Sequence, residues 1–170
     1  MKAAFTFLVL MLIALPVLAQ DTMAPPKPIE DPLWNSLIGD WEGWTEWPNG
    51  KSIDKVEFEW ELHKQFFKTQ VESKLGEMEY KLTGYATIDP KTGAMSGYWF
   101  DNFRSVLKST EIHDGNKITI KWEGGPAASE RSFEKVGDDK IVGTFKDVDP
   151  TGKPFEGKWE LTRKQKKSKM

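Results

Sequence analysis

Apolar and polar residues alternate along most of this chain with a period of two. The alternation is clearest over residues 55–62, where Lys or Glu separates each apolar side chain from the next; the apolar members are Val56, Phe58, Trp60 and Leu62. A strand with one face in a core and the other in water has this pattern. Similar segments recur between residues 39 and 163, and no sustained 3.6-residue apolar stripe interrupts them. We therefore expect an all-β barrel or sandwich of about ten strands.

Turn sequences separate these segments. Residues 48–50 are Pro-Asn-Gly, and Asn-Gly tolerates the positive φ angles of a tight hairpin. Residues 89–93 are Asp-Pro-Lys-Thr-Gly, in which Pro fixes φ and Gly supplies a left-handed exit; residues 149–152 repeat that logic in shortened form. Short turns of this kind predict antiparallel neighbours along the chain.

The stretch 37–47 is the richest in aromatic residues, with Trp at positions 41, 44 and 47. On a strand, Trp41 and Thr45 fall on one side and Trp44 on the other, between two glutamates. Gly43 lies on the side of Trp41, where it indicates a bend or a close approach of another backbone. Just before this strand, Asp31 is placed to cap a single helical turn over 32–38 that begins with Pro32.

Gly39 and Trp41 behind that short turn resemble the Gly-x-Trp signature of lipocalins and of the wider calycin group. In those proteins the Trp packs at the closed end of the barrel beneath an Arg or Lys from the last strand. Arg163 occupies the matching position here, on the same strand face as Trp159. The resemblance implies an antiparallel lipocalin/calycin-like barrel over residues 33–164, with Gly39, Trp41 and Arg163 as its structural signature.

A wider set of motifs resembles a bacterial family of unknown function, often exported, that is expected to have a lipocalin-like barrel. The set is Leu-x-Gly-x-Trp-x-Gly at 37–43, Gly-Tyr at 84–85, the turn at 89–93 and Trp-x-Asp at 99–101. This resemblance implies a fold and brings no catalytic residues. The nitrobindin-type haem proteins also open with Gly-x-Trp-x-Gly, but they ligate haem through a late His. Here the only histidines are His63 and His113, so we expect neither haem nor another cofactor.

The two ends of the chain differ from the middle. Residues 1–19 form a short apolar run with Lys2 near its start and Ala19 at its end, which predicts a signal peptide cleaved before Gln20. An uncleaved anchor is the alternative, but the run is short and contains Pro16. Residues 20–32 form a Pro-rich extended leader and 165–170 a basic tail. We expect an exported protein, periplasmic or secreted, without stable membrane insertion after cleavage.

Composition excludes several chemistries. The chain has no Cys, so thiol nucleophiles, disulfides and Cys-ligated metals are absent. Two histidines fifty positions apart lack metal-ligand spacing, and each is interpreted as a surface turn residue. There is no basic patch outside the tail, and the net charge is −2, so nucleic acid is not an expected partner.

Two sets of residues are candidates for a ligand site. The first is the polar group Asp101, Asn102 and Arg104, which follows the aromatic residues that include the further candidate Tyr98; the competing interpretation, which we favour, is a connecting turn closed by Asp101. The second is the set of aromatic residues predicted to face inward; the cavity candidates are Phe58, Trp60, Trp122, Phe145 and Phe155. Glycines within the strands, at 84, 97, 143 and 157, favour an open interior over a filled one, although they are also typical of bends.

Three functions remain open. The leading hypothesis is a binding module for a small apolar or amphipathic molecule held in the barrel. The second is an isomerase- or hydrolase-like enzyme on the same barrel that uses Tyr98, Asp101 and Arg104, and the favoured answer is that the protein is not an enzyme. The third is an envelope interaction module that uses Trp44 and edge strands as its contact surface. Oligomeric state is not readable from the sequence.

Overall fold

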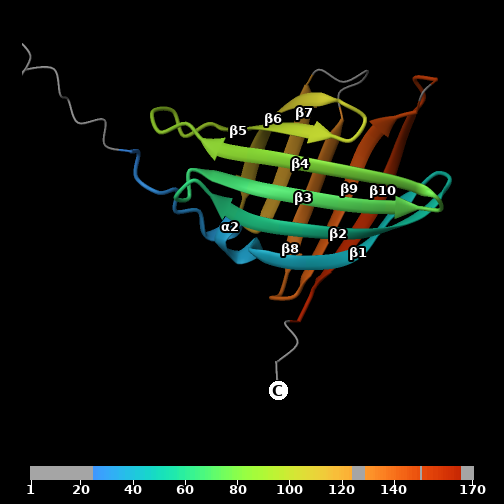
Figure 1. Cartoon of the computed structure of the whole chain (residues 1–170), viewed down its shortest axis with the longest axis horizontal. Helices are drawn as coiled ribbons and strands as arrows, with labels where there is room; N and C mark the ends of the chain where they lie inside the picture. The colour runs from blue at the N-terminus through green and yellow to red at the C-terminus, as the bar shows by residue number, and fades with distance from the viewer. Residues whose placement is uncertain (1–24, 124–128, 150, 166–170) are drawn as a thin grey trace, which may run out of the picture.

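Ten antiparallel strands form a closed barrel in the computed structural model, which describes residues 25–123, 129–149 and 151–165 (Figure 1). One short helix, α2 (Pro32–Leu37), precedes them. The strands are β1 (Gly39–Trp47), β2 (Gly50–Glu61), β3 (Phe66–Leu75), β4 (Met78–Ile88), β5 (Met95–Asp101), β6 (Val106–Asp114), β7 (Lys117–Glu123), β8 (Glu130–Val136), β9 (Lys140–Val148) and β10 (Pro154–Arg163). Each strand pairs with the next, and β1 pairs with β10, so no edge is left open. The predicted all-β barrel is confirmed.

The predicted faces of β1 are also confirmed. Trp41 and Thr45 are buried inside the barrel, whereas Trp44 lies on the other face under the ammonium of Lys51. A Cβ atom at Gly43 would overlap the carbonyl oxygen of Glu160 on β10. Gly43 therefore permits the close backbone approach that joins the first strand to the last.

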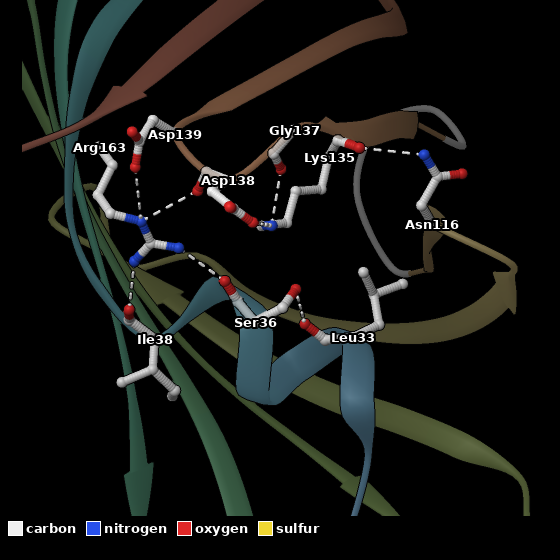
Figure 2. Close-up of polar contacts among 9 residues, drawn as sticks. All are labelled: Leu33, Ser36, Ile38, Asn116, Lys135, Gly137, Asp138, Asp139 and Arg163. Atoms are coloured by element: carbon white, nitrogen blue, oxygen red, sulfur yellow. Dashed lines mark hydrogen bonds and ion pairs between the residues drawn. The ribbon is translucent and has the colours of Figure 1, made fainter.

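The closed end of the barrel is held by Arg163, as Figure 2 shows. Its Nη1 donates to the carbonyl of Ile38 (2.6 Å) and its Nη2 to that of Ser36 (2.7 Å). The guanidinium carbon lies 4.2 Å from the centroid of the Trp41 ring, and Trp41 Nε1 donates to the carbonyl of Leu37 (2.7 Å). The expected pairing of the signature Trp and the last-strand Arg is present.

Helix α2 covers this end. The Asp31 side chain accepts a hydrogen bond from the Trp34 backbone N–H (2.7 Å), and Pro32 occupies the first helical position, as the sequence predicts. Trp34 and Leu37 are completely buried. The Trp34 ring stacks on Phe67 of β3 at a centroid distance of 5.0 Å. The helix is thus a plug whose Trp side chain enters the barrel.

The predicted signal peptide, residues 1–19, lies outside the described residues, as do 20–24 of the leader and 166–170 of the tail. The described part of the leader runs along the β2–β3 turn, where Ile29 N–H donates to the carbonyl of Lys64 (3.0 Å) and Gln65 Nε2 to that of Pro26 (3.0 Å). In the part of the chain that the structure describes, no helix is long and apolar enough to cross a membrane.

Candidate ligand-binding cavity

A cavity of about 110 Å³ runs along the interior of the barrel. Trp34 of the plug helix forms its floor, and Trp47 and Arg131 line it near the opposite end. Its middle is walled by large apolar side chains; these are Val56, Phe58, Phe67, Val71, Leu82, Trp99, Ile118, Ile120, Trp122, Phe133, Trp159 and Leu161. The interior is therefore neither fully packed nor wide.

The strand glycines explain why the cavity is narrow. A Cβ at Gly84 would overlap the Trp99 ring, and one at Gly143 would overlap the Trp159 ring. A Cβ at Gly157 would likewise meet the Phe145 ring. Each of these glycines makes room for an aromatic ring from a neighbouring strand, so the space they leave is filled. The interior does hold a cavity, as the strand glycines were expected to indicate, but the open space is not the space above these glycines.

A buried carboxylate lies in the cavity wall on β2. Asp54 is 5% exposed and accepts hydrogen bonds from three hydroxyl groups; the donors are Thr45 (2.5 Å), Ser52 (2.7 Å) and Ser73 (2.6 Å). Hydrogen bonds to an ionised acceptor stabilise its charge in a low-dielectric interior. Asp54 is thus supplied with partners by its own surroundings.

Arg131 of β8 is the cation of the cavity. Its guanidinium carbon lies 5.1 Å from the ring centroid of Phe145 and 5.8 Å from those of Trp47 and Trp122. Burial of this charged end lowers the pKa of Arg131 from its ordinary value. Among the described residues, no side-chain hydrogen bond or ion pair to the guanidinium is found. The indole N–H groups of Trp122 and Trp159 are also buried there without a partner in the described structure.

A second titratable cluster lies at the floor. Glu111 lines the cavity at 8% exposure, and its Oε2 is 3.7 Å from Nε2 of His113. His113 Nδ1 is 3.2 Å from Oδ2 of Asp31, the capping residue of α2. The His113 side chain is 11% exposed and sits on strand β6, so its interpretation as a surface turn residue was wrong. His63 is exposed in the β2–β3 turn, as expected.

The structure separates the candidate aromatic residues. Phe58 and Trp122 line the cavity. Trp60 lies beneath the floor, where it packs on Trp34 and its Nε1 donates to Asn35 Oδ1 (2.8 Å). Phe145 and Phe155 pack against each other and against Trp47 at the other end, outside the cavity lining.

The polar candidates do not come together in the cavity. Tyr98 is 54% exposed on the outer surface, because it alternates with Trp99, which faces inward. Arg104 is exposed in the β5–β6 turn at φ 69°. Asp101 closes that turn by accepting from the backbone N–H groups of Phe103 (2.9 Å) and Ser105 (2.8 Å). The competing interpretation of this cluster as a turn is the one the structure supports.

The polar residues that do line the cavity escaped the sequence reasoning. Asp54, Glu111 and Arg131 each have the strand parity of a buried neighbour: Asp54 that of Val56, Glu111 that of Ser109, and Arg131 that of Phe133. What marks these three positions in the sequence is a charged residue at the same parity as the inward-facing residues of its strand.

No protein-family model and no curated protein matches this sequence. Among solved structures, the chain is similar to the S-type phycobiliprotein lyase CPES from Guillardia theta, with a TM-score of 0.56 at 10% sequence identity. The match covers 79% of this chain and 92% of that one. At this identity the likeness concerns the fold, and it shows that the two chains share a lipocalin-like barrel.

Proposed function

We propose that this protein is a binding module for a small amphipathic molecule, whose apolar part lies between the aromatic walls of the barrel and whose polar group faces the charged residues of the lining. The observation that carries the proposal is the narrow apolar cavity with buried donors that have no partner in the described structure. A buried polar group without a partner costs about 1–3 kcal/mol, so a ligand that supplies the partner recovers that free energy.

The cavity sets the size of the ligand. Its volume of about 110 Å³ is below the roughly 300–1,000 Å³ of sites for drug-sized molecules. It is closer to engineered apolar cavities of about 150 Å³, which bind benzene. The proposed ligand therefore has an apolar part no larger than a benzene ring or a short alkyl chain. For so few atoms we expect an affinity in the millimolar to high micromolar range, about −4 to −5.5 kcal/mol.

Isothermal titration calorimetry with 1-hexanol tests the proposal. The wild-type protein should bind it, with quenching or enhancement of Trp fluorescence because Trp99 and Trp122 line the cavity. Val56→Phe places a larger side chain in the lining and should abolish binding. Ile53→Phe, on the same strand but 70% exposed, is the matched control and should bind as the wild type does. A folded wild type that binds no hexanol, or equal binding by both variants, would refute the proposal.

Export is the second part of this proposed function. It rests on the apolar run at 1–19 that ends with Ala19 before Gln20. Amino-terminal sequencing of the protein secreted or recovered from the periplasm should begin at or within a few residues of Gln20. Recovery of the full-length chain from the membrane fraction would contradict it.

A further inference from the structure

We propose that Arg131 is the anion-binding group of the cavity and that the natural ligand carries a single carboxylate. The inference rests on the proposed function and names the chemistry of its ligand. It starts from the surroundings of the guanidinium, which are the faces of Trp47, Trp122 and Phe145. Aromatic faces attract the cation but offer no acceptor for its N–H groups.

The lack of a hydrogen-bond acceptor at Arg131 is not shared by Arg163, the arginine at the closed end of the barrel. Arg163, at the closed end, also lies over a Trp ring, but its N–H groups donate to backbone carbonyls and its Nε is 3.6 Å from Asp139 Oδ1. Arg131 has no such partner in the described residues. Residues 124–128, which lie outside the description, are Gly, Gly, Pro, Ala and Ala and so add no acidic side chain. Arg131 is half-buried, and the Asp147 and Asp54 carboxylates act on its charge from beyond ion-pair distance, so its N–H groups have charged neighbours but no direct acceptor. A bound anion would supply that acceptor.

Neither acid of the cavity lining is within ion-pair distance of Arg131. Asp54 accepts from three hydroxyl groups, and Glu111 lies at the floor beside His113. Arg131 and Phe133 are two residues apart on β8 and both face the cavity, and Phe133 lines its apolar middle. An anion bound at Arg131 would therefore have its apolar part between the apolar walls. The free indole N–H of Trp122, whose ring is one of the three around Arg131, offers a second donor.

The charges of the lining also limit the anion. Two carboxylates, Asp54 and Glu111, line the same cavity as one guanidinium. With one positive and two negative groups the lining carries a net charge of −1, and a monocarboxylate brings it to −2. A dianion such as inorganic phosphate would bring it to −3 and is therefore repelled more strongly than a monocarboxylate. A planar carboxylate also matches the fork of N–H donors that a guanidinium presents. The ligand class is thus a small monocarboxylic acid with an apolar body.

The experiment compares hexanoate with 1-hexanol at pH 7.5 by calorimetry. The two probes share the apolar part and differ in the charged group. The wild type should bind hexanoate roughly tenfold or more tightly than hexanol, since a hydrogen bond to a charged group contributes more than a neutral one. Arg131→Met should bind hexanol as before and lose the preference. Its urea midpoint should change little, because Met keeps an apolar stem among the aromatic rings and Arg131 has no direct hydrogen-bond partner to lose. Lys108→Met, on the outer surface of β6, should leave the preference intact.

The outcomes separate the two proposals. Equal binding of hexanoate and hexanol by the wild type would overturn the role of Arg131 and leave the binding function standing. Binding of neither would overturn both. A lower urea midpoint in Arg131→Met, together with loss of both probes, would show a structural role instead and overturn the inference. Arg131→Lys, which keeps a charge but not the fork, should retain part of the preference; a folded Lys variant with none would count against it. Phosphate binding tighter than hexanoate would refute the carboxylate.

Discussion

Replacement of Arg163 by alanine should destabilise the protein by loosening the plug helix from the barrel. The change removes three hydrogen bonds, one from Nε to the carbonyl of Asp138 (3.2 Å) and two to the carbonyls of Ser36 and Ile38 at the end of α2. Carbonyls at a helix end have no partner within the helix, so the two bonds at α2 satisfy groups that would otherwise be unpaired. The change also removes the cation from its position 4.2 Å from the Trp41 ring centroid.

The magnitude follows from these contacts. A hydrogen bond that involves a charged group contributes about 1.5–3 kcal/mol, and the cation–π contact about 0.5–2 kcal/mol. The Arg163 side chain is 26% exposed, so water replaces part of the lost hydrogen bonding in the variant. We therefore expect the free energy of unfolding to fall by roughly 2–4 kcal/mol, which corresponds to a lowering of the urea midpoint by about 1–2 M.

Urea unfolding followed by Trp fluorescence measures this change, with Lys140→Ala as the control. Lys140 pairs with Glu160 at 2.9 Å, but its side chain is 45% exposed, so its loss should cost less than about 1 kcal/mol. Arg163→Lys should be intermediate, because a Lys retains the charge but cannot bind two carbonyls with a rigid fork. An Arg163→Ala protein with the midpoint of the wild type would refute the reasoning.

Three further predictions concern other parts of the barrel. Gly43→Ala should lower the free energy of unfolding, measured in urea titrations, by several kcal/mol, because its Cβ would overlap a backbone carbonyl of β10 that cannot move aside. A variant as stable as the wild type would show that β1 and β10 do not pair closely. Trp60→Ala should destabilise the fold by roughly 2–4 kcal/mol, because Trp60 packs on Trp34 and Phe67. Trp44→Ala should cost much less, because Trp44 lies on the outer face of the barrel. Equal losses of stability in the two variants would contradict this assignment of faces. Burial, with the nearby Asp101 carboxylate, raises the pKa of Tyr80 to about 12, above its ordinary value of 10.0, so between these pH values the folded state keeps a proton that the unfolded state releases. The free energy of unfolding should therefore fall as pH rises from 10 to about 12, and it should fall more steeply than in Tyr80→Phe. Identical pH profiles of the two proteins would refute this prediction.

Much of the fold can be predicted from local sequence. The Pro-Asn-Gly turn joins β1 to β2, which begins at Gly50, and the Asp89 carboxylate accepts from the backbone N–H groups of Lys91 (2.8 Å) and Thr92 (2.9 Å), as the turn residues indicate. These hydrogen bonds hold the pKa of Asp89 below its ordinary value. Such features depend on residues within a few positions of one another, so the sequence determines them without reference to the rest of the chain.

The inner and outer faces of each strand can also be predicted, provided the phase is correct. In β1 and β2 the alternation is regular, and Trp41 and Phe58 are buried as expected. In β5 the aromatic run at 98–100 has no polar residue to mark its phase, and Tyr98, a predicted ligand-site residue, lies on the outer face. A one-residue error of phase exchanges the two faces of a strand completely.

The contents of the barrel were decided by the tertiary structure alone. By itself the sequence determined an all-β chain with its turns and a short helix capped by Asp31, and its resemblance to lipocalins implied the Trp–Arg pair at the closed end. It did not determine that rings from neighbouring strands fill the space above Gly84 and Gly143, or that three aromatic residues from three strands surround Arg131. The physical reason is that alternation fixes which side chains point inward, whereas the volume and the charge partners inside depend on which of them meet across the closed barrel.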